Sequence, residues 1–170
     1  MQDDAPQRHF AGVLHTVAIQ VFPDAVADFQ RRRPAYGFQV AQAIRSKTDR
    51  FLSTFRGKVT IISEFGAEAN THNPPGRPGS FSFQTRFLRQ HINAYRGKAG
   101  LSGMLIWNLR DFAVAPSFAG GSISRQVPGI KIVRGVNQKG LFDHNGRPKP
   151  SVDVVRELFG PLGTGLRGAS

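Results

Sequence analysis

The stretch KVTIISEFGAEAN, Lys58 to Asn70, is the segment on which the fold depends. Its apolar, β-branched run from Val59 to Ile62 is typical of a buried strand, and the strand ends on Glu64. Burying an unpaired carboxylate is unfavourable, so the end of such a strand is where this charge is expected. A carboxylate there can serve as a nucleophile or a general base. The alternative is a Glu64 side chain that points into solvent or pairs with an arginine.

Strand and helix patterns alternate on both sides of this stretch. Buried-type strands are expected at 12–22, 59–65 and 103–109, and amphipathic helices at 37–55, 80–95 and 151–159. In the last helix Ser151 is a candidate N-cap, and Gly160 follows the expected end. The alternation predicts an α/β fold with parallel strands. A closed (β/α)8 barrel takes eight such units and about 250 residues, so three units do not close one. The pattern alone is also compatible with an open sheet, but no Gly-rich phosphate loop follows any of these strands, so a nucleotide-binding sheet has no support.

Length and composition favour one globular unit. The chain has 170 residues, of which 39% are hydrophobic and 20% charged. The absence of cysteine excludes disulfides and thiolate metal sites, and the histidines show no metal-ligand spacing. We therefore expect neither a metal nor another cofactor. No apolar run approaches the roughly 20 residues of a membrane helix, and the N-terminus has no signal-peptide core. These features predict a cytoplasmic protein without a membrane partner.

The charge balance suggests an alternative function. Lys and Arg number 23 against 11 Asp and Glu, which leaves a formal charge of +12. Such a balance is a reason to consider a basic nucleic-acid-binding module. However, no aromatic residues alternate with the basic ones in the manner of a base-stacking surface. We interpret the charge as scattered over the surface and expect no nucleic-acid partner.

Polar or aromatic candidates follow the predicted strands. Trp107, the only tryptophan, ends the strand at 103–109 and is followed by Asn108. An isolated tryptophan is usually a core residue, but one at a strand end beside a polar group is also typical of sugar sites. His72, in the loop after Glu64, is a further candidate. Glu68 in the same loop is interpreted as a structural partner for an arginine.

Three segments together carry a family resemblance. VTIISEFGAEANTH, GMLIWNLRDFAV and NQKGLFDHNGRPKPS, in this order, resemble the C-terminal part of the catalytic TIM barrel of glycoside hydrolase family 2. That family includes β-galactosidases, β-glucuronidases and β-mannosidases. The resemblance covers residues 37–159 and implies that the strands are the sixth to eighth of the barrel. Residues 1–36 match poorly apart from one possible barrel strand, and 160–170 are expected to form a disordered tail.

The resemblance also implies roles for individual residues. Glu64 matches the catalytic nucleophile and Trp107 the tryptophan that lines the sugar subsite. Asn137 and Lys139 match an Asn-x-Lys motif that recognises the sugar carboxylate in β-glucuronidases. Arg134 lies near the position of an assisting arginine, but its spacing differs by one residue. Without the resemblance, Asn137 and Lys139 would be interpreted as ordinary loop residues.

One element of the family is missing. Retaining glycosidases use two carboxyl groups, and in this family the acid/base is the glutamate of an Asn-Glu pair. No Asn-Glu pair occurs in the 170 residues. We therefore expect an incomplete barrel that is inactive alone and that needs a missing barrel half or an oligomer partner. The predicted function is that of a retaining β-glucuronidase acting on a β-glycoside, with a β-galactosidase of the same family as the alternative.

Overall fold

A computed structural model describes residues 36–117 and 130–163 of the chain. Three helices account for most of the regular structure: α2 (Tyr36–Thr54), α3 (Phe81–Tyr95) and α5 (Ser151–Gly163). The longer strands are β1 (Thr60–Phe65) and β4 (Leu101–Ile106). Four two-residue strands complete the set: β2 (Ala69–Asn70), β3 (Gly79–Ser80), β5 (Phe112–Ala113) and β6 (Val136–Asn137). The described part of the chain is thus α/β.

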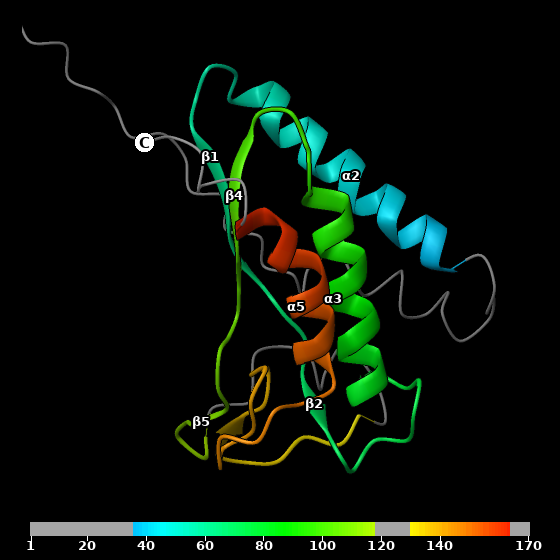
Figure 1. The fold of residues 1–170 in the computed structure, drawn as a ribbon. Coiled ribbons are helices and arrows are strands. Elements are labelled where there is room, and N and C mark those ends of the chain that lie inside the picture. The colour runs from blue at the N-terminus through cyan, green and yellow to red at the C-terminus, as the bar shows by residue number, and fades with distance from the viewer. Residues whose placement is uncertain (1–35, 118–129, 164–170) are drawn as a thin grey trace, which may run out of the picture.

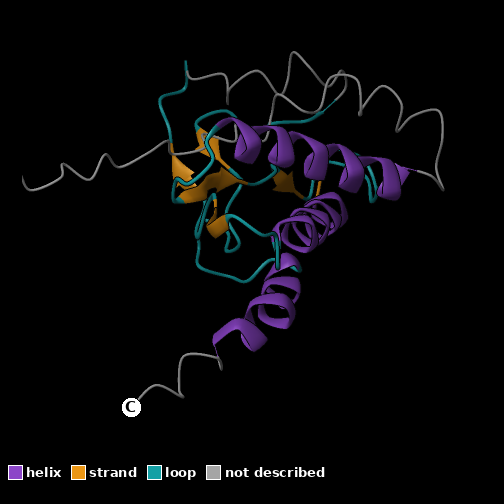
Figure 2. Cartoon of the chain, turned by 90° about the horizontal axis from the view of Figure 1, so that it is seen from above, coloured by secondary structure: helices purple, strands orange, loops and turns teal. Residues whose placement is uncertain are grey.

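Strands β1 and β4 form a parallel pair, and helix α3 lies between them in the chain. Ile62 pairs with Met104 and Phe65 pairs with Ile106, with a register shift between these two positions. In Figure 1 both strands lie on one side of the molecule, and the three helices lie on the other. Figure 2 shows the same separation from above. This is the βαβ arrangement that the alternation of strands and helices predicts.

The core forms between this strand pair and the helices. Strand β1 contributes Ile62 and Phe65, which are 0% and 1% exposed. Helix α3 turns one apolar face toward them, and it also packs against α2 and α5. The α3 residues in this core are Phe83, Phe87, Leu88, Ile92, Ala94 and Tyr95. The apolar residues at helical spacing in the sequence therefore do form the buried face of a helix.

Most predicted elements are confirmed within a few residues. The helices expected at 37–55 and 80–95 are α2 and α3, and the strands expected at 59–65 and 103–109 are β1 and β4. Helix α5 differs from its prediction because it continues past Phe159 to Gly163. Gly160 does not have the positive φ with which a glycine commonly ends a helix, so it remains helical. The expected strand at 12–22 and residues 164–170 lie outside the described residues.

Several loops and short strands gather at the C-terminal ends of the parallel strands. The short pairs β2–β3 and β5–β6 and the segment 130–150 gather below the C-terminal ends of β1 and β4 in Figure 1. Segments far apart in the sequence are joined there by backbone hydrogen bonds, such as Ala69 N to Gln138 O at 3.0 Å. None of the helices in the described residues is long and apolar enough to cross a membrane.

Candidate active site

Glu64 and Trp107 lie at the ends of neighbouring strands. Glu64 is the next-to-last residue of β1 and its side chain is exposed. The amide of Trp107 donates to the carbonyl of Phe65 at 2.8 Å, which extends the β1–β4 ladder by one residue. The Trp107 side chain is 39% exposed, and its ring meets the ring of Phe112 edge-on at 6.2 Å. The two principal sequence candidates are therefore adjacent and accessible at one edge of the sheet.

Gly66 makes this close approach possible. A Cβ atom built on Gly66 would lie 1.8 Å from the carbonyl oxygen of Trp107, closer than any real contact. The backbone after β1 therefore touches the backbone after β4 directly, with no side chain between them. The Trp107–Asn108 peptide bond in this contact is cis.

The Asn-x-Lys segment lies beside Trp107 and Asn108. The amide of Asn108 donates to Lys139 O at 3.4 Å, and the amide of Leu141 donates to Asn108 O at 3.0 Å. Asn137, in β6, accepts the amide of Lys139 on its own Oδ1 at 3.1 Å, which fixes the local turn. The structure thus places Asn137 and Lys139 at the same edge of the sheet as Trp107.

Glu68 holds this segment at two points, one of which is Lys139. Its Oε2 atom accepts the amide of Gln138 at 3.0 Å, and its Oε1 atom is 3.1 Å from the Lys139 ammonium. Glu68 is only 2% exposed. The distance to Lys139 is that of an ion pair, but the geometry does not form a hydrogen bond to Oε1. The interpretation of Glu68 as a structural partner for an arginine is therefore wrong about the partner, which is Lys139.

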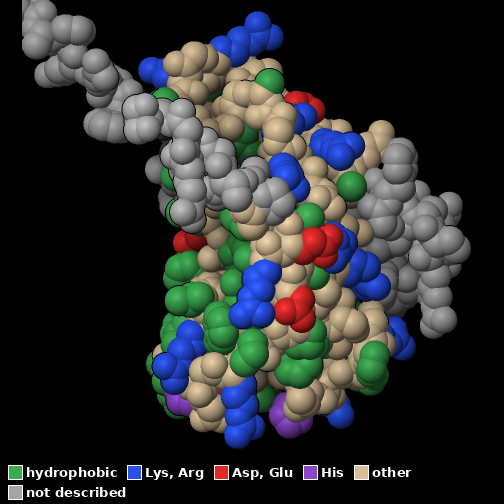
Figure 3. Space-filling model, in the orientation of Figure 1, with side chains coloured by type: hydrophobic (Ala, Val, Ile, Leu, Met, Phe, Trp, Pro, Cys, Tyr) green, Lys and Arg blue, Asp and Glu red, His purple; other side chains and the backbone are tan. Residues whose placement is uncertain are grey.

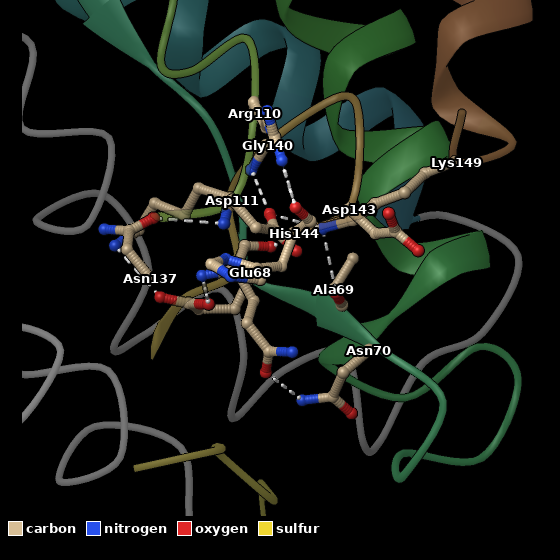
Figure 4. Close-up of polar contacts among 12 residues, drawn as sticks. Glu68, Ala69, Asn70, Arg110, Asp111, Asn137, Gly140, Asp143, His144 and Lys149 are labelled. Carbon is tan, nitrogen blue, oxygen red and sulfur yellow. Dashed lines mark hydrogen bonds and ion pairs between the residues drawn. The ribbon is translucent and has the colours of Figure 1, made fainter. Parts of the chain in front are cut away.

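A second buried pair, Asp111 with Lys149, lies next to the first (Figure 4). Lys149 Nζ donates to Asp111 Oδ1 at 2.8 Å, to Gln138 O at 2.9 Å and to Ala69 O at 3.1 Å. Asp111 also accepts the amide of Gly140 at 2.8 Å. Burial raises the pKa of Asp111 and lowers that of Lys149, and their mutual contact opposes both shifts. This pair joins the loops after β1 and β4 to the segment before α5.

Gln84 connects the helices to the same loops. Its side-chain amide lies 3.0 Å from Ala67 O, 3.2 Å from Lys139 O and 3.1 Å from Gly140 O. Its Oε1 atom accepts the hydroxyl of Ser151 at 2.8 Å, which links α3 to the start of α5. Sequence reasoning did not identify Gln84 or Lys149. For Gln84 a signal existed, because it is a polar residue on the apolar face of α3.

The remaining candidates lie less centrally. His72 and Arg134 are exposed, and the backbone amide of His72 donates to Asn70 Oδ1 at 2.9 Å. Asn108 is half-buried, and its side-chain amide donates to Arg110 O at 2.5 Å. The Asn108 Oδ1 atom is buried without a hydrogen-bond partner among the described residues. Within the described ranges, no group of three or more His, Asp or Glu side chains could hold a metal ion.

The site therefore combines three chemical features at one sheet edge: an exposed carboxylate, a half-exposed indole and a buried ammonium. Exposed apolar side chains extend this edge, and Figure 3 shows hydrophobic surface over the region of β4 and β5. These side chains are Leu105, Trp107, Leu109 and Phe112. An apolar surface beside a carboxylate and a cation is suited to an acidic sugar, whose C–H faces are apolar.

Comparison with known proteins finds similarity to glycosidases. The chain is 30% identical over 106 residues to the β-glucuronidase of Mus musculus, a match that covers 60% of this chain and 14% of that protein. A solved structure of a glycoside hydrolase family 2 β-galacturonidase from Eisenbergiella tayi, bound to galacturonate, matches with a TM-score of 0.59. It is 26% identical, and the match covers 71% of this chain and 21% of that one.

A β-glucuronidase structure from Faecalibacterium prausnitzii matches with a TM-score of 0.57. At 21% identity that likeness concerns the fold, over 78% of this chain and 20% of the other. No family model matches the chain. The chain spans about a fifth or less of the length of these relatives. In sequence and in fold, then, it resembles part of the glycosidases of glycoside hydrolase family 2.

Proposed function

We propose that this chain supplies the nucleophile and the uronate-binding part of a retaining β-glucuronidase-type hydrolase. The single observation that carries the proposal is the placement of Glu64, Trp107 and Lys139 at one edge of the β1–β4 pair. These residues come from separate segments, which the fold joins through backbone hydrogen bonds from Trp107 N to Phe65 O and from Asn108 N to Lys139 O. The family resemblance gives each of them a role in the same site.

Glu64 would act as the nucleophile. Its carboxylate attacks the anomeric carbon, and the glycosidic C–O bond breaks with its electron pair going to the leaving oxygen. That oxygen takes a proton from a general acid. This chain contains no Asn-Glu pair to supply that acid. Water then cleaves the glycosyl ester on Glu64, so the product keeps the configuration of the substrate. The exposure of Glu64 supports this role because attack needs an accessible oxygen.

Lys139 would select the substrate. A glucuronide differs from a glucoside by a carboxylate at C5, and an ammonium beside that carboxylate favours the acidic sugar. Asn137 would assist as the neighbouring amide, and the indole of Trp107 would face the sugar ring. Two of the compared proteins are β-glucuronidases and one is a β-galacturonidase. A galacturonide keeps the carboxylate and differs at C4, so it is the second candidate substrate.

The test is a chimera in which residues 37–159 replace the corresponding segment of a complete family 2 β-glucuronidase that has its own acid/base. We expect Glu64→Gln to lower kcat by about a thousandfold or more, because an amide is a poor nucleophile. Glu157→Gln, which alters an exposed carboxylate of α5, is the matched control and should leave kcat within about twofold.

The same chimera tests the uronate-binding role. Lys139→Ala should lower the glucuronide-to-galactoside ratio of kcat/KM by about tenfold or more, since charge-assisted hydrogen bonds contribute about 1.5–3 kcal/mol. The exposed Lys131 of the same segment is the control. An unchanged ratio would remove the β-glucuronidase assignment and leave the β-galactosidase alternative.

A further inference from the structure

The buried lysines Lys139 and Lys149 differ in how fully they are hydrogen-bonded. Lys149 Nζ donates to three oxygens of described residues, which is all that an ammonium can do. Among the described residues, Lys139 Nζ has one charged partner, Glu68 Oε1 at 3.1 Å, and makes no hydrogen bond to it. Lys149 is therefore saturated, whereas Lys139 retains donors for a further acceptor.

Glu68 controls where those donors lie. It is almost fully buried and contacts the Asn-x-Lys segment twice, at the amide of Gln138 and at the ammonium of Lys139. A buried ammonium without a counter-ion is strongly unfavourable, so Glu68 provides the counter-charge of Lys139 and fixes its position. The same negative charge opposes any second carboxylate that approaches the ammonium.

We infer that Glu68 is a specificity-determining positioning residue, which holds Lys139 in place and limits how strongly the site prefers an acidic sugar. This inference rests on the proposed function, because it assigns Lys139 to the sugar carboxylate. A bound uronate shares the Lys139 ammonium with Glu68. Glu68 does not touch the reacting atoms; it acts through Lys139 and through the amide of Gln138.

The inference predicts opposite effects from two substitutions. Glu68→Gln keeps an oxygen that can accept the amide of Gln138 but removes the competing charge, so preference for a uronide should rise. Lys139→Met removes the ammonium, so the preference should disappear. Asp111→Asn is the matched control, because it also neutralises a buried carboxylate of this cluster. The partner of Asp111 is Lys149, whose three hydrogen-bond donors are already used within the protein.

The experiment measures glycoside binding by the full 170-residue chain. Trp107 is the only tryptophan and is 39% exposed beside the site, so its fluorescence reports binding without a label. Methyl β-D-glucuronide and methyl β-D-glucoside are titrated at equal ionic strength, and the ratio of their dissociation constants is compared between variants. Thermal unfolding followed by circular dichroism checks that each variant is folded.

We expect Glu68→Gln to raise the preference for glucuronide by about tenfold, Lys139→Met to reduce it to about one, and Asp111→Asn to leave it unchanged. If Glu68→Gln does not fold, Glu68→Asp replaces it. That variant keeps the charge but withdraws it by one methylene, and it should raise the preference by about threefold.

The outcomes separate this inference from the proposed function. If Lys139→Met abolishes the preference while the folded Glu68 variants match the unmodified chain, the role of Glu68 is wrong and that of Lys139 stands. If Lys139→Met leaves the preference unchanged, the proposed role of Lys139 fails as well. Absence of any glycoside-dependent fluorescence change also overturns the inference, because the inference requires that this chain binds the sugar carboxylate. The proposed function is then tested separately, by the turnover of the chimera.

Discussion

At the scale of single residues, neighbouring groups with the same chemistry have different environments. Lys139 and Lys149 are 8% and 4% exposed, and both lie beside a buried carboxylate. They differ in the number of oxygens around the ammonium. Lys149 donates to three and braces the loops, whereas Lys139 has donors left for a ligand. Replacing one member of such a buried pair leaves an uncompensated charge, so stability alone cannot separate the two roles.

His91 gives a prediction at this scale. It lies on the buried face of α3, 1% exposed, with its ring stacked on that of Phe87 at 3.9 Å. Burial lowers the pKa of His91 from 6.5 to about 4, and the contact of Nδ1 with Phe87 O opposes that shift. Between these values the unfolded chain binds a proton that the folded chain does not. The contribution of neutral His91 to the free energy of unfolding is therefore fully present above pH 6.5 and is lost as the pH drops toward 4.

The expected loss across this interval is about 3 kcal/mol, since each unit of pKa difference corresponds to about 1.4 kcal/mol. Urea unfolding at a series of pH values measures it. His91→Leu should remove most of the pH dependence between pH 6.5 and 4.5. If that variant keeps the same dependence as the unmodified chain, other groups are responsible and the role given to His91 is wrong.

At the scale of elements, the spacing of apolar residues predicts the helices and the longer strands, because these elements depend mainly on local sequence. Helices α2 and α3 and strands β1 and β4 follow from the spacing of apolar residues, and the structure places them within a few residues of prediction. The two-residue strands β2, β3, β5 and β6 were not predicted, because their pairing depends on segments brought together by the rest of the fold. The position of Lys139 beside Trp107 could be expected only through the family resemblance. The partner of Glu68 could not be predicted at all.

The contact between the ends of β1 and β4 predicts unequal effects for two glycines. A Cβ at Gly66 would collide with the backbone of Trp107, whereas a Cβ at Gly103 in β4 would meet Ile61 Cγ2 at an ordinary 3.5 Å. Gly66→Ala should therefore lower the free energy of unfolding by about 2 kcal/mol or more, since backbone must move. Gly103→Ala should change it by less than about 1 kcal/mol.

Urea unfolding gives both free energies, and the emission maximum of Trp107 shows whether its environment has changed. Equal effects of the two substitutions, or an unaltered Trp107 in folded Gly66→Ala, would contradict the direct backbone contact on which the candidate site depends.

At the scale of the whole molecule, the charge of +12 predicts weak and salt-sensitive association with nucleic acid. Nonspecific binding through several phosphate contacts weakens log-linearly with salt. We expect binding to a random oligonucleotide, measured by fluorescence anisotropy, to disappear near about 0.15 M salt. Tight, sequence-selective binding that persists there would favour the nucleic-acid alternative.

The whole chain is also predicted to have negligible glycosidase turnover by itself. General acid catalysis contributes about 10²–10⁴-fold, and the family's Asn-Glu pair is not in these residues. Release of nitrophenol from an aryl β-glucuronide by the purified chain measures this. Turnover at enzyme-like rates that is lost on Glu64→Gln would show that the chain contains a general acid of its own.

The most direct measurement of the central claim is covalent trapping of the nucleophile. A 2-deoxy-2-fluoro-β-glucuronyl fluoride has a leaving group that needs little acid assistance, and the fluorine at C2 slows release of the glycosyl ester. Applied to the chimera that contains residues 37–159, it should add one sugar to Glu64, as located by peptide mass spectrometry. Glu64→Gln should prevent the addition, and the corresponding galactosyl fluoride should label much more slowly. An adduct on another residue, or none on Glu64 in a folded chimera, would contradict the account.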